Sequence, residues 1–162
     1  MIKNIVKIFA IFFLVIVQLT LVPYFAIGNV WPNLVFILVL VLVIFDHDYD
    51  AYLTASFGGL MLDLASPMFF GFFTLILMGF ALMTKFLVNK FLTGTSPLVM
   101  SVIIFICIVI YDSIFVIISH EFNLIGFIFN ILFSIAWAQF FLYILNLRSK
   151  RFNISTVRLD LR

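Results

Sequence analysis

The chain has 162 residues, of which 66% are hydrophobic and 10% charged, and its formal net charge is +2. Its mean hydropathy is +1.34, whereas a soluble domain is roughly half apolar and one-quarter charged. The composition predicts a single polytopic membrane domain with room for about six spans of about 20 residues. It leaves no length for a soluble enzymatic domain, and the small positive charge indicates topology and contact with membrane lipid, with no nucleic-acid partner.

The nine Lys and Arg residues fall into three clusters separated by two long apolar stretches. The clusters are Lys3 with Lys7, Lys85 with Lys90, and the residues from Arg148 onward. Basic residues near transmembrane ends stay on the cytoplasmic side. Both termini and the middle cluster are therefore predicted to be cytoplasmic, and each stretch between clusters should cross the membrane an even number of times.

The first predicted segment, residues 5–26, follows two lysines as a signal peptide would. Its apolar stretch is longer than a signal h-region and no A-x-A site follows, so it is predicted to be an uncleaved helix. The second segment, residues 32–45, opens with Pro32, which a first helical turn tolerates because its missing N–H would be unpaired there anyway.

The third predicted segment, residues 51–65, follows a turn with three acids that suit the positive end of a helix dipole, Asp46, Asp48 and Asp50. Segments two and three are short, since about 14 residues cover about 21 Å of a roughly 30 Å hydrocarbon core. They either cross the bilayer by thinning it or by extending through the turn, or they dip in and return.

The fourth predicted segment, residues 67–91, opens with Ser66 as N-cap and Pro67 at the first helical position. A fifth segment, a sixth segment and a basic cytoplasmic tail complete an all-α prediction of six membrane helices, at residues 98–119, 124–147 and 148–162.

Two acids in apolar surroundings are candidate functional residues, because a carboxylate inside a membrane is costly without a partner. Asp63 lies near the C-terminus of its segment, where the helix dipole is unfavourable. It could accept hydrogen bonds from Ser66 or from the N–H groups opening the fourth helix, contact a partner protein, or relay protons or ions. If neutral hydrogen bonds hold it, Asp63→Asn should be tolerated. Asp112 could bond to Asn130 or Ser134, or could have a functional role.

A row of small residues lies along one ridge of the third segment, with Ala51, Ala55 and Gly59 at i,i+4 spacing and Gly58 beside the last. Small residues let helix backbones approach closely in a membrane. The spacing leaves open whether the neighbour is another helix of the same chain, which is favoured, or a partner.

No motif for catalysis, metal or cofactor binding is present. Asp46, Asp48 and Asp50 have the spacing of the first calcium-loop ligands, but Ala51 and Phe57 replace the turn glycine and the closing glutamate. One cysteine and two distant histidines do not make a usual zinc site. The chain is therefore predicted not to be an enzyme and to bind no cofactor or metal.

The polar landmarks resemble those of the bacterial rod shape-determining MreD family. They are Gln18, Pro23, the run WPNL at residues 31–34, the run GGLMLDLASP at residues 58–67, and Gly71. The resemblance covers the whole chain in size and segment order, but its specific part is confined to residues 18–71.

This resemblance implies a non-enzymatic, multi-pass subunit of the cell-wall elongation machinery in the bacterial inner membrane. Its direct partner would be MreC, and through MreC the actin-like MreB, RodA and a class B penicillin-binding transpeptidase. The fold would be a six-helix bundle resembling the substrate-binding component of energy-coupling-factor transporters. The residues matching the family pattern would be structural or interface positions: Pro32, Asn33, Gly58, Gly59, Asp63, Ser66, Pro67 and Gly71.

That resemblance of fold also leaves a second function open, a subunit that captures a small vitamin-type ligand for a transporter. A capture subunit should place several polar groups around an outward cavity. The outer half of this chain offers Asp63, Asp112, Asn130 and a few hydroxyls, which favours the scaffold.

Overall fold

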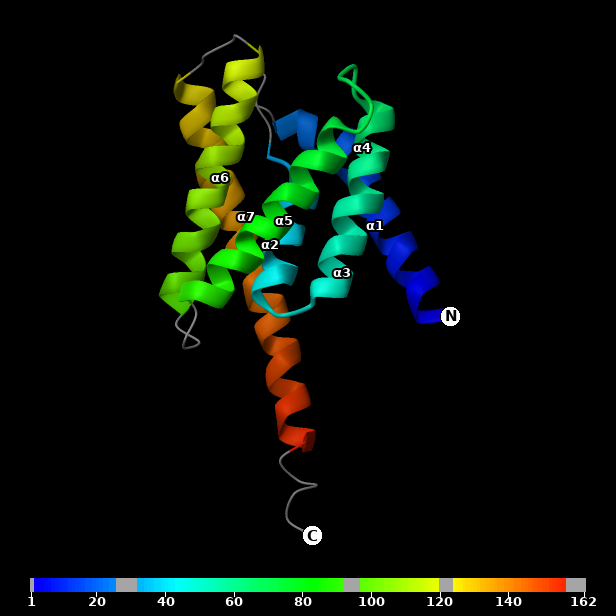
Figure 1. Ribbon diagram of the computed structural model, residues 1–162, viewed down its shortest axis with the longest axis vertical. Coiled ribbons are helices and arrows are strands. Elements are labelled where there is room, and N and C mark those ends of the chain that lie inside the picture. The colour runs from blue at the N-terminus through cyan, green and yellow to red at the C-terminus, as the bar shows by residue number, and fades with distance from the viewer. Residues whose placement is uncertain (1, 26–31, 92–96, 120–123, 157–162) are drawn as a thin grey trace.

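The computed structural model describes residues 2–25, 32–91, 97–119 and 124–156, and it contains helices but no strands in these ranges. In chain order (Figure 1) the elements are α1 (Ile2–Thr20), η1 (Val22–Phe25), α2 (Leu34–Ile44), α3 (Asp48–Leu53), η2 (Thr54–Gly58), α4 (Gly59–Ala65), α5 (Phe72–Phe91), α6 (Pro97–Ser119) and α7 (Leu124–Thr156). Trp31 lies outside the described residues, and so does the part of the predicted tail that follows Thr156.

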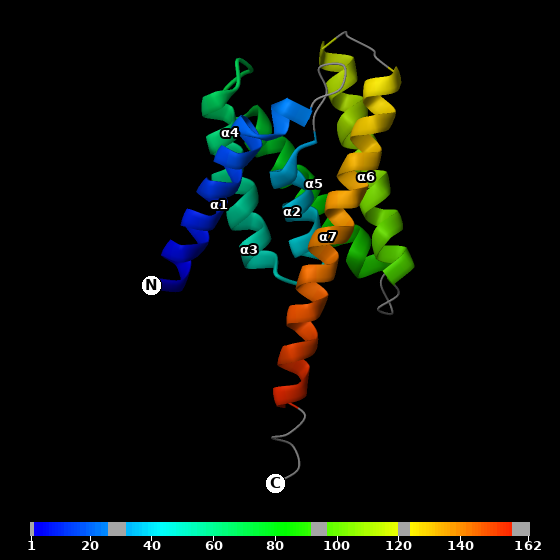
Figure 2. The same ribbon diagram turned by 180° about the vertical axis from the view of Figure 1, so that it is seen from behind.

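The short helix α2 lies at the centre of the bundle. Its sequence, LVFILVLVLVI, is apolar on every side, and a helix of this kind is stable only when it is surrounded. Ten of its residues are buried, and α1, α5, α6 and α7 all pack against it. Seen from behind, α2 lies between α1 and α3 on one side and α6 and α7 on the other (Figure 2).

Four helical segments are long and apolar enough to cross a membrane: Ile5–Tyr24, Phe72–Lys90, Met100–Ile117 and Leu124–Ile144. Their outer faces carry large exposed hydrophobic side chains, such as Phe13, Leu75 and Ile125, which are 67–76% exposed. Large exposed apolar faces of this kind are costly in water and favourable in lipid. The chain is therefore a helical protein compatible with a membrane, with α2 as a shorter apolar helix inside it.

The helices α3 and α4 are joined without a break by the π-helical turn η2, and together they make a rod about 27 Å long. The small-residue ridge predicted from the sequence faces inward. Ala51 and Ala55 are fully buried, and Gly58 and Gly59 contact α2 and α5. The neighbours of the ridge are therefore helices of the same chain.

Several helix boundaries differ from those expected. The helix α5 begins at Phe72 rather than at Pro67, so Ser66 and Pro67 do not open it. Pro32 lies outside α2, whose N-cap is Asn33. At the other end of the chain, α7 continues to Thr156 instead of ending at residue 147.

The first half of α1, the turn between α2 and α3, and the last turns of α5 meet at one end of the bundle, here called the basic end after Lys7, Lys85 and Lys90. The C-terminal end of α7 extends beyond the bundle in the same direction (Figure 1). Lys7 pairs with Asp50. Lys85 pairs with Asp46 and, at 2.8 Å, with Asp48.

The turn between α2 and α3 reverses the chain tightly. Asp46 adopts a φ of +60° there, a left-handed conformation in which aspartate is enriched among non-glycine residues. Asp48 and Asp50 lie in the first turn of α3, so they suit its dipole as the sequence predicts. They also pair with the lysines of α1 and α5, which ties three elements together.

Candidate functional site

Five buried polar side chains with hydrogen-bonding roles cluster toward the end of the bundle opposite the basic end. They come from five helices or helix starts: Gln18, Asn33, Asp63, Asp112 and Asn130. Each is at most 8% exposed, so each has to find its hydrogen-bond partners within the protein.

Two side chains satisfy the free N–H groups at the start of α2. The side-chain oxygen of Asn33 accepts from Phe36 N at 3.0 Å, as an N-cap does. Gln18 Oε1, from α1, accepts from Val35 N at 3.0 Å. Because α2 starts inside the bundle, unpaired N–H groups there would be costly. Gln18 and Asn33 therefore allow a helix to begin in an apolar interior.

Asn33 also connects α2 to α6. Its Nδ2 donates to the hydroxyl oxygen of Tyr111 at 2.7 Å. The Tyr111 ring stacks on Phe36 with a centroid distance of 4.1 Å, and the ring centroid of Phe115 lies 4.9 Å from that of Tyr111. Phe115 in turn contacts Phe73 at the start of α5, with a centroid distance of 5.6 Å. An aromatic cluster thus joins the capped start of α2 to the start of α5.

Asp63 caps the start of α5 from the end of α4. Its Oδ1 accepts from Phe73 N at 2.7 Å, and its Oδ2 accepts from Thr74 N at 3.1 Å and from Thr74 Oγ1 at 2.6 Å. A carboxylate is favourable at a helix N-terminus. Asp63 lies at the unfavourable pole of its own helix and at the favourable pole of the next one.

Gly59 makes this cap possible. It lies one turn before Asp63 on the same face of α4, against the first turn of α5. A Cβ added at Gly59 would lie 2.6 Å from Thr74 Cα and 3.0 Å from Thr74 N. Only glycine allows the two backbones to come this close, and the close approach brings the carboxylate within reach of its three donors.

The connection between α4 and α5 contains three more of the residues that match the family pattern: Ser66, Pro67 and Gly71. Ser66 Oγ accepts from Met68 N at 3.2 Å and does not contact Asp63. Pro67 is exposed. Gly71 adopts a φ of +94°, a region that glycine occupies readily, and its carbonyl accepts from Leu75 N at 2.9 Å. This local turn positions the first residues of α5 under Asp63.

Asp112, on α6, meets Asn130, on α7. The two side chains are hydrogen-bonded, and they are 6% and 3% exposed. Asn130 belongs to a ridge of small or polar residues at i,i+4 spacing that lets α7 pack closely: Gly126, Asn130, Ser134 and Ala138. From the sequence, Asn130 and Ser134 are predicted only as possible partners of Asp112. Their regular spacing with Gly126 and Ala138 is the signal that would have revealed the ridge.

Replacing Asn33 by Ala is expected to lower the unfolding temperature in detergent by roughly 4–8 °C, for a loss of about 2 kcal/mol. The change removes both the cap of α2 and the bond to Tyr111. Unfolding can be followed by the reaction of Cys107 with a thiol-specific dye, because this single cysteine is fully buried. Tyr111→Phe is the control, since it removes only the link to α6, and it should cost less. An equal or larger loss for Tyr111→Phe would contradict the capping role.

The contacts of this arrangement are hydrogen bonds and helix caps. Among the described residues, no three His, Cys, Asp or Glu side chains gather as metal ligands. The carboxylate of Asp63 and the amides of Gln18 and Asn33 bind backbone N–H groups of the chain itself. No protein-family model, curated protein or solved structure matches the chain.

Proposed function

We propose that this chain is a non-enzymatic, multi-pass scaffold subunit of the bacterial cell-wall elongation machinery, located in the inner membrane. It would bind MreC directly and reach MreB, RodA and a class B penicillin-binding transpeptidase through that complex. The proposal rests on the resemblance to the MreD family and on the way the interior of the bundle is used.

The observation that carries the proposal is that the interior is filled by the chain itself. The residues of α2 occupy the centre of the bundle, where a capture subunit would need room for a ligand, and six of them are at most 1% exposed. The first N–H groups of α5 are also all used: Phe72 N donates to Phe69 O, Leu75 N to Gly71 O, and those between to Asp63. A helix start occupied in this way does not offer its N–H groups to an anionic ligand.

The contacts of the resemblance residues agree with a structural role. Asn33 caps α2, Gly59 admits α5, and Asp63 caps α5. These residues maintain the shape of the bundle, so a partner would meet the shape they create and the apolar outer faces.

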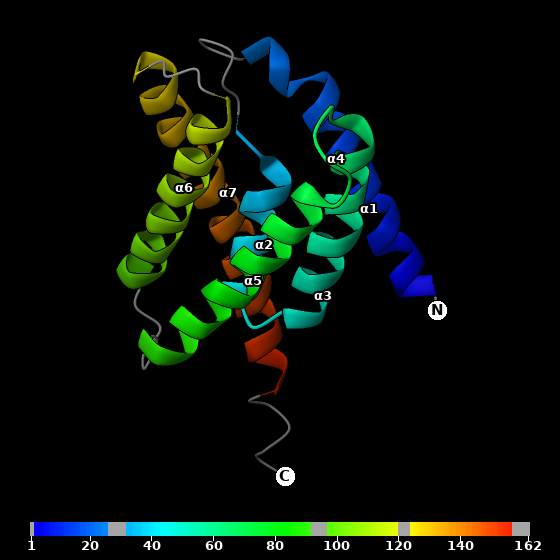
Figure 3. The ribbon, with the colours of Figure 1, turned by 45° about the horizontal axis from the view of Figure 1, so that its top comes forward.

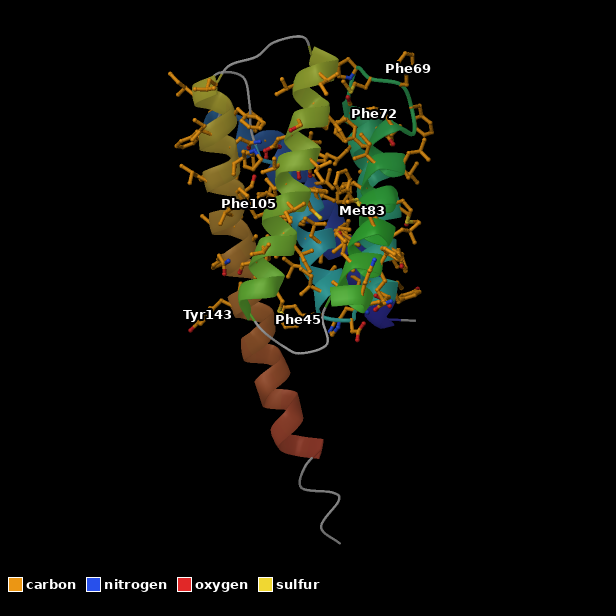
Figure 4. The ribbon with its side chains drawn as sticks, turned by 60° about the vertical axis from the view of Figure 1, so that its left-hand side comes forward. Phe45, Phe69, Phe72, Met83, Phe105 and Tyr143 are labelled. Carbon is orange, nitrogen blue, oxygen red and sulfur yellow. The ribbon has the colours of Figure 1, made fainter. Side chains whose placement is uncertain are left out.

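The outer faces offer surface for a partner helix. On α7, a shallow apolar hollow of about 280 Å³ is lined by Phe133, Ala136, Trp137 and Phe140. In Figure 4, Phe69 lies at the upper end of the bundle, while Phe45 and Tyr143 lie toward the lower, basic end. In lipid, helices associate through packing, so a scaffold of this size acts through such faces.

The topology that belongs to this proposal puts the basic end in the cytoplasm. In a chain with Cys107 replaced by Ala, a cysteine at Phe69, which is 89% exposed, should react with an impermeant reagent in intact cells. A cysteine at His47, exposed in the turn at the basic end, should react only after the cells are opened. Labelling of position 47 and protection of position 69 in intact cells would reverse the orientation.

Affinity purification of the tagged chain in a mild detergent, followed by mass spectrometry, tests the function. The expected result is copurification of an MreC-type protein with wall-synthesis proteins, absent from a control with another tagged membrane protein. Recovery of a transporter ATPase module instead would support the ligand-capture alternative. Recovery of neither would contradict the scaffold proposal.

A further inference from the structure

The Asp112 and Asn130 side chains leave two buried oxygen atoms without a partner among the described residues. They are Asp112 Oδ2 and Asn130 Oδ1. A carboxylate can only accept hydrogen bonds and an amide NH₂ can only donate them. The bond between the two residues therefore joins Asn130 Nδ2 to Asp112 Oδ1. The remaining atoms are both acceptors as long as the carboxyl is ionised.

Among the described residues of the elements packed against α6, no cation is placed to compensate a negative charge at Asp112. The elements packed against α6 are α2, α5 and α7. The helix α2 has no ionisable side chain, and α7 has none between Leu124 and Gln139. Lys85 and Lys90 of α5 lie near its last turns, at the basic end, and Lys85 is paired with acids there. Tyr111, the neighbour on α6, is a neutral phenol bonded to Asn33.

A single proton removes both problems. A carboxylic acid and a primary amide form a cyclic pair with two hydrogen bonds: the amide N–H donates to the acid carbonyl, and the acid O–H donates to the amide carbonyl. Here the first bond exists, and the two unpartnered atoms are those of the second. A proton on Oδ2 makes the carboxyl neutral and supplies the missing donor.

We propose that Asp112 and Asn130 form a buried proton-binding site between α6 and α7, in which Asp112 carries a proton on Oδ2 at neutral pH. The ligand is a proton rather than a metal cation, because a cation replaces its hydration shell with several oxygens, whereas this pair offers two. The protonated pair joins α6 to α7 by two hydrogen bonds. Its loss at alkaline pH leaves an ionised carboxyl in an apolar interior. This inference does not depend on the proposed function.

Asp63 is a matched internal control. It is as buried as Asp112, at 4% against 6% exposure, but it accepts from three donors. Both oxygens of Asp63 are engaged by these donors, whereas Asp112 Oδ2 has no partner among the described residues. The two buried acids are therefore expected to react differently in one molecule under one condition.

The test uses the purified full-length chain in detergent and dicyclohexylcarbodiimide, an apolar reagent that adds to protonated carboxyl groups. Peptide mass spectrometry should show modification of Asp112 at neutral pH, a decline as the pH rises, and little modification of Asp63. In Asp112→Asn, which keeps the shape and can pair with Asn130 as an amide, the modification should disappear. Protection of Asp112 by Na⁺ at constant pH would show that a metal cation occupies the site and would overturn the proposal.

Infrared difference spectroscopy reads the proton without a reagent. The spectrum of the unsubstituted chain minus that of Asp112→Asn should contain the carbonyl band of a protonated carboxyl at neutral pH, and this band should weaken at alkaline pH. A carboxylate band in its place at neutral pH would overturn the proposal, whatever the carbodiimide result.

Discussion

Gly59→Leu is expected to prevent α4 from packing against α5 and to lower the unfolding temperature of the purified chain by roughly 5–10 °C. The added Cβ alone would meet Thr74 Cα at 2.6 Å, and a backbone atom cannot turn aside as a flexible side chain can. Overpacking in a well-packed core typically costs about 1–3 kcal/mol, and about 1 kcal/mol shifts the unfolding temperature by about 2–4 °C for a chain of this size. Separation of the two backbones also removes the donors of Asp63, which adds to the loss.

Gly79→Leu is the matched control for this prediction. Gly79 lies in the middle of α5, is exposed, and has nothing within 4 Å of an added Cβ. The substitution and the helical environment are the same, so the difference between the two variants measures the close approach at Gly59. The readouts are the amount of folded protein in the membrane and the temperature at which Cys107 becomes reactive. Equal behaviour of the two variants would show that α4 and α5 are not in backbone contact.

The long apolar helices could be predicted from the sequence because their lengths and compositions are local properties. The helix α6 covers Pro97–Ser119, within one residue of the predicted 98–119 at each end. The uniform hydrophobicity of α2 likewise belongs to its own eleven residues. Its position at the centre of the bundle (Figure 3) depends on four other helices and could not be derived from them individually.

The start of α5 shows why other features escaped prediction. Ser66 and Pro67 have the local pattern of a helix start, and that pattern predicted a helix from residue 67. The groups that accept from the first N–H groups of α5 include Asp63, which lies on the preceding helix. A start capped by another element, together with Gly71 at φ +94°, moves the beginning of α5 to Phe72. Local pattern alone does not report such a tertiary cap.

The polar contacts between distant segments likewise could not be predicted from each segment taken alone. The pairing of Lys85 with Asp46 joins residues 39 positions apart. The bond from Asn33 to Tyr111 joins residues 78 positions apart. The sequence marked Asp63 and Asp112 as unusual in apolar surroundings, because the cost of burial is a property of each residue, while Asn33 was named only through the family resemblance. Their partners depend on how the helices pack.

Asp63→Leu is expected to be the most damaging change among the polar residues, and Asp63→Asn should fall between it and the unsubstituted chain. The sequence alone predicts that Asn is tolerated if neutral hydrogen bonds are what hold Asp63. The geometry alters that expectation, because Oδ1 and Oδ2 each accept from a backbone N–H. An amide has one acceptor oxygen, so Asn leaves either Phe73 N or Thr74 N facing an NH₂ group. A buried unpaired donor costs about 1–3 kcal/mol.

Leu leaves both N–H groups and the Thr74 hydroxyl without this acceptor, so its loss should be roughly twice that of Asn. Ser66→Ala is the control, because Ser66 bonds only within the turn, to Met68 N, and it should change the unfolding temperature little. The order Asp, Asn, Leu in unfolding temperature, measured by the reactivity of Cys107, would establish Asp63 as the cap of α5.

Copurification of a partner with each Asp63 variant is a second, separate measurement. If Asn preserves most of the stability but abolishes copurification, the charge of Asp63 also serves a partner. If Leu matches the unsubstituted chain in both measurements, then α5 begins without help from Asp63, and the cap is not what holds α4 and α5 together.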